Sequence, residues 1–145
     1  AMQCLEHMLP FSEPSVVDVV AALIRDENGR VLLAQRSDDA TWEFPGGKCE
    51  LGERWDDSVV RELGEELSLQ VKPKRIVGTW EHLRNDVLLR IHLIQCTIEK
   101  GPLTLDPLVH ADVKWYRPSR PQSLNWTGRD GEMMEYIAQY ESMPS

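Results

Sequence analysis

Hydrophobic positions along the chain fall into a few runs whose periods predict both strands and helices. A nearly continuous aliphatic run covers residues 16–25, and a second covers 31–34, with an Asn-Gly pair between them. Because Asn-Gly favours a tight two-residue turn, we predict a β-hairpin here. Two further strand-like runs, 75–83 and 87–98, are separated by polar residues and predict an antiparallel pair.

Two other segments show the spacing of apolar residues that predicts amphipathic helices. The first runs from 56 to 67, with apolar positions Val59, Leu63 and Leu67. The second runs from 130 to 140, with apolar positions Met133, Ile137 and Tyr140. Between them, Gly and Pro residues predict an irregular segment that ends in a short strand at 113–116. This order of elements predicts an α+β fold.

The first helix carries acidic residues at spacings that cost stability. Glu62, Glu65 and Glu66 lie at i, i+3 and i+4, so the pattern places all three carboxylates on one exposed face. Like charges at these spacings cost a few tenths of a kcal/mol per pair, and Gly64 within the helix costs about 1 kcal/mol more. We interpret the face as a cation site, for which Mg²⁺ or Mn²⁺ suits oxygen ligands. The alternative is a solvated acidic helix.

A glycine-rich stretch precedes this helix. Pro45-Gly46-Gly47, and then Gly52 before Glu53, predict a tight loop whose backbone can approach a ligand closely. A glycine-rich loop that leads into an acidic helix fits a phosphate group bridged to the protein by a metal ion.

The stretch and the helix together match a known signature. It reads Gly, five residues, Glu, seven residues, then Arg-Glu-apolar-x-Glu-Glu-x-Gly-apolar, and the chain matches it from Gly47 to Leu69. Together with the preceding Trp-Glu-Phe-Pro-Gly-Gly-Lys, this match makes the chain resemble the Nudix hydrolases. One position departs, because Ser68 stands where the family has Gly. That Gly usually ends the helix in a left-handed conformation, so Ser should cost about 1 kcal/mol of stability there.

The resemblance implies a Nudix-type α/β/α sandwich with a mixed β-sheet, formed by residues 8–145 as a single Nudix hydrolase domain. Residues 1–7 are interpreted as an expression remnant ahead of a start at Met8, with Met2 as the alternative start. By resemblance, the metal ligands are Glu62, Glu65, Glu66 and the Gly46 carbonyl. One of these carboxylates would activate water, and we favour Glu62.

Two further features of the site follow from the resemblance. Arg61 should pair with Glu53 or Glu50 and fix the loop against the helix, since a guanidinium holds carboxylates well; Arg61 and Glu53 thus complete the catalytic set. Many relatives also have a metal-binding carboxylate where this chain has Val109. The possible substitutes nearby are Asp106, His110 and Asp112.

The small size, the lead-in motif and the acid before the last helix are similar to the MutT-like branch, which cleaves nucleoside triphosphates, in some members oxidised or non-standard ones, to a monophosphate and pyrophosphate. The resemblance implies substrate binding by Arg36, Phe44, Gly47, Lys48 and Asp130. Asp130 would read the base edge; the alternative is that it only caps the helix. Rival functions are hydrolysis of another nucleoside diphosphate linked to a second group, and a non-catalytic nucleotide sensor.

The composition of the chain limits the classes of molecule that it is expected to bind. The 145-residue chain has a net charge of −8, which argues against nucleic-acid binding because phosphate backbones require basic surface. No run of eighteen apolar residues and no signal pattern is present, so we expect a cytoplasmic protein without membrane contact. A nucleotide is the expected partner, and either a monomer or a homodimer is compatible with the sequence.

Overall fold

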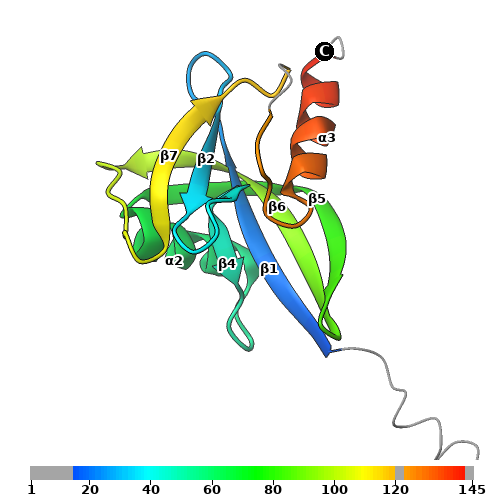
Figure 1. Ribbon diagram of the computed structural model, residues 1–145. Helices are drawn as coiled ribbons and strands as arrows, with labels where there is room; N and C mark the ends of the chain where they lie inside the picture. Colours follow the sequence, from blue (N-terminus) through cyan, green and yellow to red (C-terminus); the bar gives the residue numbers. More distant parts are fainter. Residues whose placement is uncertain (1–14, 120–122, 143–145) are drawn as a thin grey trace, which may run out of the picture.

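Two β-sheets form the centre of the computed structural model, which describes residues 15–119 and 123–142 (Figure 1). The four-stranded sheet has the order β4-β1-β6-β5 and comprises β1 (Ser15–Ile24), β4 (Gly46–Lys48), β5 (Gln70–Arg84) and β6 (Val87–Lys100). The three-stranded sheet has the order β3-β2-β7 and comprises β2 (Val31–Arg36), β3 (Trp42–Glu43) and β7 (His110–Tyr116). The larger sheet is mixed, because β1 runs parallel to β6 whereas its other pairs are antiparallel. The interpreted remnant at 1–7 and the start at Met8 lie outside the described residues.

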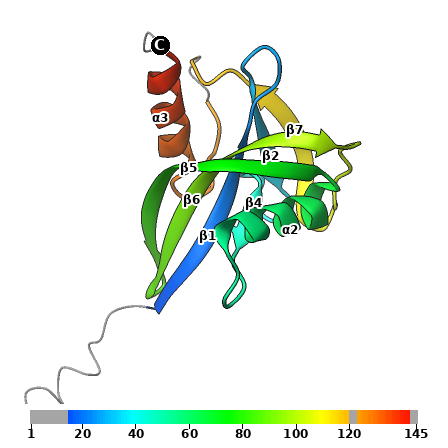
Figure 2. The same ribbon diagram turned by 180° about the vertical axis from the view of Figure 1, so that it is seen from behind.

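Helices α2 (Trp55–Leu67) and α3 (Asp130–Ser142) pack on opposite faces of the larger sheet (Figures 1 and 2). Strand β1 separates two cores because its side chains alternate between these faces. Val20, Ala22 and Ile24 belong to the core beneath α2, whereas Ala21 and Leu23 belong to the core beneath α3. The apolar run of β1 is therefore that of a strand buried on both faces.

The turn predicted between the first two strands is present, but the prediction that these strands pair as a hairpin is wrong. The Asp26 carboxylate holds this turn by accepting the backbone N–H groups of Asn28 and Arg30, each at 2.9 Å. An isolated antiparallel bridge joins Arg25 to Val31, after which β1 and β2 enter different sheets. Both strands are apolar on two faces. Each is therefore buried within its own sheet, and β1 does not pair with β2 beyond the turn.

The second predicted pair is confirmed, since β5 and β6 are antiparallel along their length. Asn85 and Asp86 at the turn have φ values of 49° and 64°, which matches the two positive φ angles of a tight hairpin turn. The short strand predicted at 113–116 is also present and begins earlier, at His110.

The apolar face predicted for α3 is partly wrong. Met133 and Ile137 are buried as expected, and Met134 joins them, but Tyr140 is 56% exposed. Tyr140 instead lies edge-on to Tyr136, with ring centroids 4.6 Å apart. Neither described helix is long and apolar enough to cross a lipid bilayer.

The glycine-rich stretch is not a free loop. Gly46–Lys48 forms the edge strand β4, which pairs antiparallel with β1. A Cβ atom at Gly46 would lie 1.9 Å from the carbonyl oxygen of Val20, so only glycine permits this close pairing. The close backbone approach that we predicted toward a ligand is here an approach toward the neighbouring strand.

Helix α2 ends as predicted, at Ser68, whose φ of 55° and ψ of 29° are left-handed. The backbone N–H of Ser68 donates to the Gly64 carbonyl at 3.2 Å, which completes the helix end.

We expect Ser68→Gly to raise the free energy of unfolding by up to about 1 kcal/mol, because glycine adopts the left-handed conformation of this position without strain. Urea denaturation measures the change, and Ser68→Ala, which keeps the Cβ atom, is the matched control. A less stable Ser68→Gly protein would contradict the prediction.

Candidate active site

A cavity of about 410 Å³ lies where β1, β3, β4, α2 and the start of α3 meet. Its lining includes seven of the residues that the sequence predicted for the site: Arg36, Phe44, Gly46, Gly47, Lys48, Glu66 and Asp130. The other four, Glu53, Arg61, Glu62 and Glu65, do not line the cavity. The structure therefore brings the predicted substrate residues together around one space, with Glu66 as the helix carboxylate that reaches it.

Arg61 joins the helix to the preceding segment. Its Nε donates to Glu53 Oε2 at 2.8 Å and its Nη2 to Glu53 Oε1 at 2.9 Å, which is the predicted ion pair in a two-pronged form. The contact with Glu50 is longer, at 3.7 Å. Arg61 Nη2 also donates to the Lys48 carbonyl at 3.1 Å, so this one side chain ties β4 to α2.

Glu62 lies against β4. A Cβ atom at Gly47 would lie 2.5 Å from the carboxyl carbon of Glu62, so glycine is required for this carboxylate to occupy its position. Arg61 Nη1 donates to Glu62 Oε1 at 3.0 Å and to Glu65 Oε2 at 3.2 Å. Burial raises the pKa of Glu62, and the charge of Arg61 opposes that shift.

The prediction that all three carboxylates are exposed is wrong for two of them. The Glu65 side chain is 59% exposed, but that of Glu62 is only 12% exposed and Glu66 is half-buried. Burial, together with the nearby carboxylates of Glu62 and Glu43, raises the pKa of Glu66 to about 8, although a hydrogen bond from the Gly46 backbone lowers it. The helical spacing correctly predicted that the three carboxylates share one face of α2. It could not predict that strand β4 covers part of that face.

The acidic groups fit a hard cation. Within residues 15–119 and 123–142, no three acidic, His or Cys side chains already surround one point. Arg61 forms ion pairs with both Glu62 and Glu65. Glu66 Oε2, however, is buried and has no hydrogen-bond partner among the described residues. A buried carboxylate oxygen without a hydrogen-bond partner, next to other carboxylates, is a suitable ligand for a divalent cation.

Glu43 is a site residue that we did not predict. Its side chain is 12% exposed, Arg36 Nη1 donates to its Oε1 at 3.3 Å, and its Oε2 lies 2.9 Å from His110 Nε2. The Glu43 charge raises the pKa of both Glu66 and Asp130, and all three side chains line the cavity. Alternation in the lead-in motif was the available signal, since Trp42 and Phe44 point into the core and the residue between them points away.

The substitutes considered for the missing carboxylate do not line the cavity, whereas Val109 does. His110 is fully buried against Glu43. Asp106 accepts the backbone N–H of Leu108 at 3.0 Å, and Asp112 accepts that of Val113 at 2.8 Å. Asp38, Asp39 and Glu43 line the cavity in addition to Glu66 and Asp130, and of these three Glu43 is the one whose side chain is largely buried.

Asp130 is buried at the first position of α3, with 7% exposure. Its Oδ2 accepts the backbone N–H of Phe44 at 2.9 Å, so the carboxyl joins α3 to the lead-in segment. Burial raises the pKa of Asp130 to about 8, and Glu43 adds to this shift, while the Phe44 N–H and Arg36 oppose it. Burial therefore favours the protonated form of Asp130.

The aromatic residues divide between core and cavity. Phe44 is 3% exposed but contributes to the cavity wall, whereas Trp42 packs edge-on against Tyr116 in the core, with ring centroids 5.6 Å apart. Trp126 packs against the same core and also lines the cavity. Its position after a Pro-rich segment gave no periodic signal in the sequence.

We expect the stability difference between Asp130→Asn and wild type to grow with pH. The folded pKa of about 8 exceeds the ordinary value of 3.8, so between these values the unfolded chain has lost a proton that the folded chain retains. This carboxyl's contribution to stability is thus lost as pH rises, by up to about 1.4 kcal/mol per pH unit. Asn carries no such proton, so its advantage should increase by on the order of 3 kcal/mol from pH 5 to pH 8. Urea denaturation at both pH values measures it, and a constant difference would contradict the prediction.

Comparison with known proteins gives the class. Residues 16–137 match the NUDIX domain family. A CTP pyrophosphohydrolase of Escherichia coli (strain K12) is 35% identical over 107 residues, which are 71% of this chain and 77% of the relative. An 8-oxo-dGTP diphosphatase of the same strain is 40% identical over 57 residues, which are 37% of this chain and 44% of the relative. The chain spans less than half the length of some curated relatives that it matches.

Among solved structures, the solution structure of the E. coli ORF135 protein is similar, with a TM-score of 0.77 and 29% identity over 91% of this chain and 96% of that one. The chain belongs to the NUDIX family. These matches confirm the predicted MutT-like Nudix hydrolase and the predicted sandwich of helices around a mixed sheet.

Proposed function

We propose that this protein hydrolyses a nucleoside triphosphate between the α and β phosphates, in a reaction that requires Mg²⁺ or Mn²⁺. The observation that carries the proposal is a single cavity lined both by Glu66 of the acidic helix and by Asp130. The products would be a nucleoside monophosphate and pyrophosphate. The names of the two E. coli relatives, which refer to CTP and to 8-oxo-dGTP, support a nucleotide of this size as substrate.

The acidic end of the cavity would hold the phosphates. Glu62, Glu65, Glu66 and the Gly46 carbonyl would bind the cation, which when bound would withdraw charge from phosphate oxygens and acidify water. Lys48 and Arg84 also line the cavity and would supply positive charge for the remaining phosphate oxygens. Arg61 and Glu53 would act by fixing β4 against α2.

Glu62 remains our assignment for the residue that accepts the proton of water. Burial raises its pKa, which moves a carboxylate toward the basicity that proton transfer near neutral pH requires. Its fixed position against Gly47 would orient that water. Glu66, with a pKa near 8, is the alternative base.

The other end of the cavity would read the base. A protonated Asp130 offers an O–H donor at one oxygen, and its Oδ2, which accepts the Phe44 N–H, keeps a second lone pair as an acceptor. Cytosine and adenine present the complementary pair, an amino donor next to a ring-nitrogen acceptor. Guanine presents such a pair at O6 and N1–H, and two adjacent donors at N1–H and its amino group. Phe44 and Trp126 would contact the face of the base. If Asp130 meets the N1–H and amino edge of guanine, we expect a cytosine or adenine nucleotide to be preferred over guanine at neutral pH.

A nucleotide panel tests this proposal. CTP, dCTP, ATP, GTP, 8-oxo-dGTP, ADP-ribose and a UDP-sugar would be incubated with the protein and Mg²⁺, with products separated by ion-exchange chromatography. We expect the triphosphates to be cleaved with the highest kcat/KM. Faster cleavage of ADP-ribose or the UDP-sugar would replace the proposal with hydrolysis of another nucleoside diphosphate derivative. Binding without turnover of any compound would favour the sensor.

A further inference from the structure

A buried histidine holds one of the carboxylates that line the active-site cavity. His110 is fully buried at the start of β7, and its Nε2 lies 2.9 Å from Oε2 of Glu43, which lines the cavity. His110 itself is not among the residues that line the cavity. Any effect of this imidazole on a bound ligand is therefore exerted through Glu43.

The smaller sheet sets the position of both residues. In the strand order β3-β2-β7, Glu43 lies on β3 and His110 on β7, so their side chains meet across β2 although the two residues are 67 positions apart in sequence. Backbone pairing fixes both strands to β2. Groups held on paired strands keep a more constant separation than groups on loops, so this contact suits a carboxylate that needs one fixed orientation.

The surroundings of the imidazole ring favour one donor nitrogen. His110 Nδ1 is buried and has no hydrogen-bond partner among the residues that the structure describes. A proton on Nδ1 would be a buried donor without an acceptor, which is unfavourable. The favoured ring thus carries its proton on Nε2 and donates it to the Glu43 carboxylate.

His110 orients Glu43 more firmly than Arg36 does. Arg36 Nη1 donates to Glu43 Oε1 at 3.3 Å, but the same guanidinium donates to Asp38 from Nε at 2.9 Å and from Nη2 at 2.7 Å. The Arg36 side chain is 38% exposed, whereas that of His110 is 0% exposed. An exposed arginine shared between two carboxylates has room to move, and a fully buried imidazole does not.

The fixed carboxylate lies where a nucleotide would meet it. Glu43 lines the same cavity as Glu66 and Asp130, and its charge raises the pKa of both groups. Each oxygen of a carboxylate has two lone pairs, so Glu43 can accept a further hydrogen bond while Arg36 and His110 hold it. A hydroxyl or amino group of a bound nucleotide would supply that donor.

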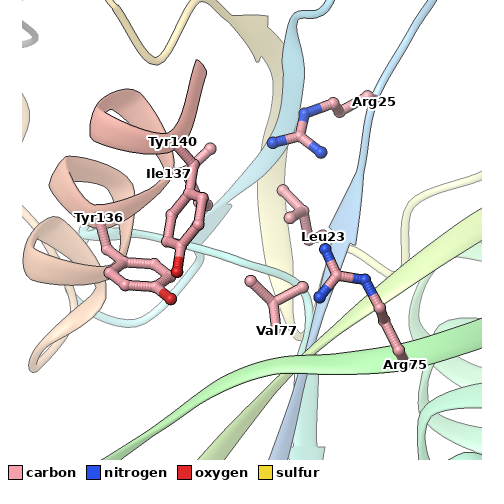
Figure 3. A pocket seen from close by; sticks show the side chains of 7 residues that line it. All are labelled: Leu23, Arg25, Arg75, Val77, Tyr136, Ile137 and Tyr140. Atoms are coloured by element: carbon pink, nitrogen blue, oxygen red, sulfur yellow. The ribbon is translucent and has the colours of Figure 1, made fainter. Parts of the chain in front are cut away.

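A second cavity, of about 250 Å³, lies between α3 and the larger sheet (Figure 3). Its side chains come from α3, from β5 and from β1 and its end, and they include neither Glu43 nor His110. A molecule bound there would not contact Glu43, so the contact between His110 and Glu43 concerns the active-site cavity.

We propose that His110 is a positioning residue for substrate binding, because it holds Glu43 in the orientation in which the carboxylate accepts a hydrogen bond from the nucleotide. This inference rests on the proposed function, since it takes a nucleotide as the occupant of the cavity. It concerns binding of the nucleotide and not of the cation, because neither His110 nor Glu43 is among the proposed cation ligands.

The test compares His110→Leu with His110→Gln in the full chain. Leucine fills buried space but has no donor, whereas glutamine keeps an N–H donor on a side chain of similar reach. We expect His110→Leu to lower kcat/KM for CTP by on the order of ten-fold, mainly through a higher KM, because the lost contact is to bound substrate. His110→Gln should recover most of that loss, and thermal melting checks that each variant is folded.

A double-mutant cycle shows whether His110 acts through Glu43. Glu43→Ala removes the carboxylate, so adding His110→Leu to it should change kcat/KM by about two-fold or less. Glu43→Gln serves in the same cycle if the alanine variant does not fold. His92→Leu is the matched control and should keep the wild-type kcat/KM, because His92 also contacts a carboxylate, that of Asp18 at 2.9 Å, and does not line the cavity.

Three results would overturn the proposal. One is a wild-type KM in His110→Leu. Another is a loss in His110→Gln as large as that in His110→Leu, since the donor would then be irrelevant. The third is an equal effect of His110→Leu with and without the Glu43 carboxylate, because His110 would then contribute only to packing.

Failure of the proposed function is distinguished by binding. If wild type does not cleave CTP, its Kd for CTP in Mg²⁺, followed by tryptophan fluorescence, replaces kcat/KM in the same cycle. Binding that depends on both His110 and Glu43, without turnover, would contradict the proposed hydrolysis and support the positioning role. Absence of both turnover and binding would overturn the two proposals together.

Discussion

Glu66→Gln is expected to lower the rate of nucleotide hydrolysis by on the order of a hundred-fold or more while the protein stays folded. Glutamine keeps the shape of the side chain but removes the charge that would bind the cation. The structure strengthens this expectation, because Glu66 is the helix carboxylate that lines the cavity and its Oε2 has no hydrogen-bond partner among the described residues. Burial of this charge is unfavourable, so its removal should leave stability unchanged or raise it.

Initial rates of pyrophosphate release at saturating Mg²⁺ measure the effect, and thermal melting in EDTA confirms that the variant is folded. Glu135→Gln, on the exposed surface of α3, makes the same chemical change away from the cavity and should keep the wild-type rate. Near-wild-type turnover of Glu66→Gln would remove this residue from the site.

Asp130→Asn is expected to change the ranking of substrates, and the change should depend on pH. At about pH 6.5 wild-type Asp130 is protonated and offers a donor and an acceptor, as Asn does, so the two proteins should rank bases alike. At about pH 9 the wild-type carboxylate has only acceptors and favours guanine, while Asn keeps both groups. The ratio of kcat/KM for GTP to that for CTP should then differ between the two proteins by on the order of ten-fold or more.

Asp57→Asn is the control for a change of charge, because Asp57 is exposed on α2 and does not line the cavity. The Asp57→Asn variant should rank the substrates in the same order of kcat/KM as wild type at both pH values. Identical rankings for Asp130→Asn and wild type at pH 9 would leave Asp130 as a structural link to Phe44. Base contacts would then be sought at Arg36, Phe44 and Trp126.

The sequence predicted local elements of this fold better than their partners. The four-residue spacing of Val59, Leu63 and Leu67 predicted α2, and these residues are indeed buried. The left-handed end at Ser68 followed from the position of the family's glycine. The pairing of β1 was not predictable from its own residues, because a strand that is apolar on both faces does not specify its neighbours. Its parallel partner β6 lies far along the chain.

In the candidate active site, too, residues within the local motif were predicted and residues that depend on long-range contacts were not. The signature gave Glu53, Arg61 and the helix carboxylates, and their ion pair formed as expected. Glu43 was missed because its role depends on His110, which is distant in sequence and meets it only after β2, β3 and β7 have paired. The raised pKa of Asp130 was equally hard to predict, since it depends on burial in the folded structure and not on residue type.

The most direct test of the proposed function is the identity of the products formed from CTP in Mg²⁺, with excess EDTA in a parallel sample. We predict equal amounts of CMP and pyrophosphate in Mg²⁺ and neither product in EDTA, with Glu66→Gln close to the EDTA sample. CDP with orthophosphate, or the same rate with and without EDTA, would contradict hydrolysis at the α–β bond by a cation held on the acidic face of α2.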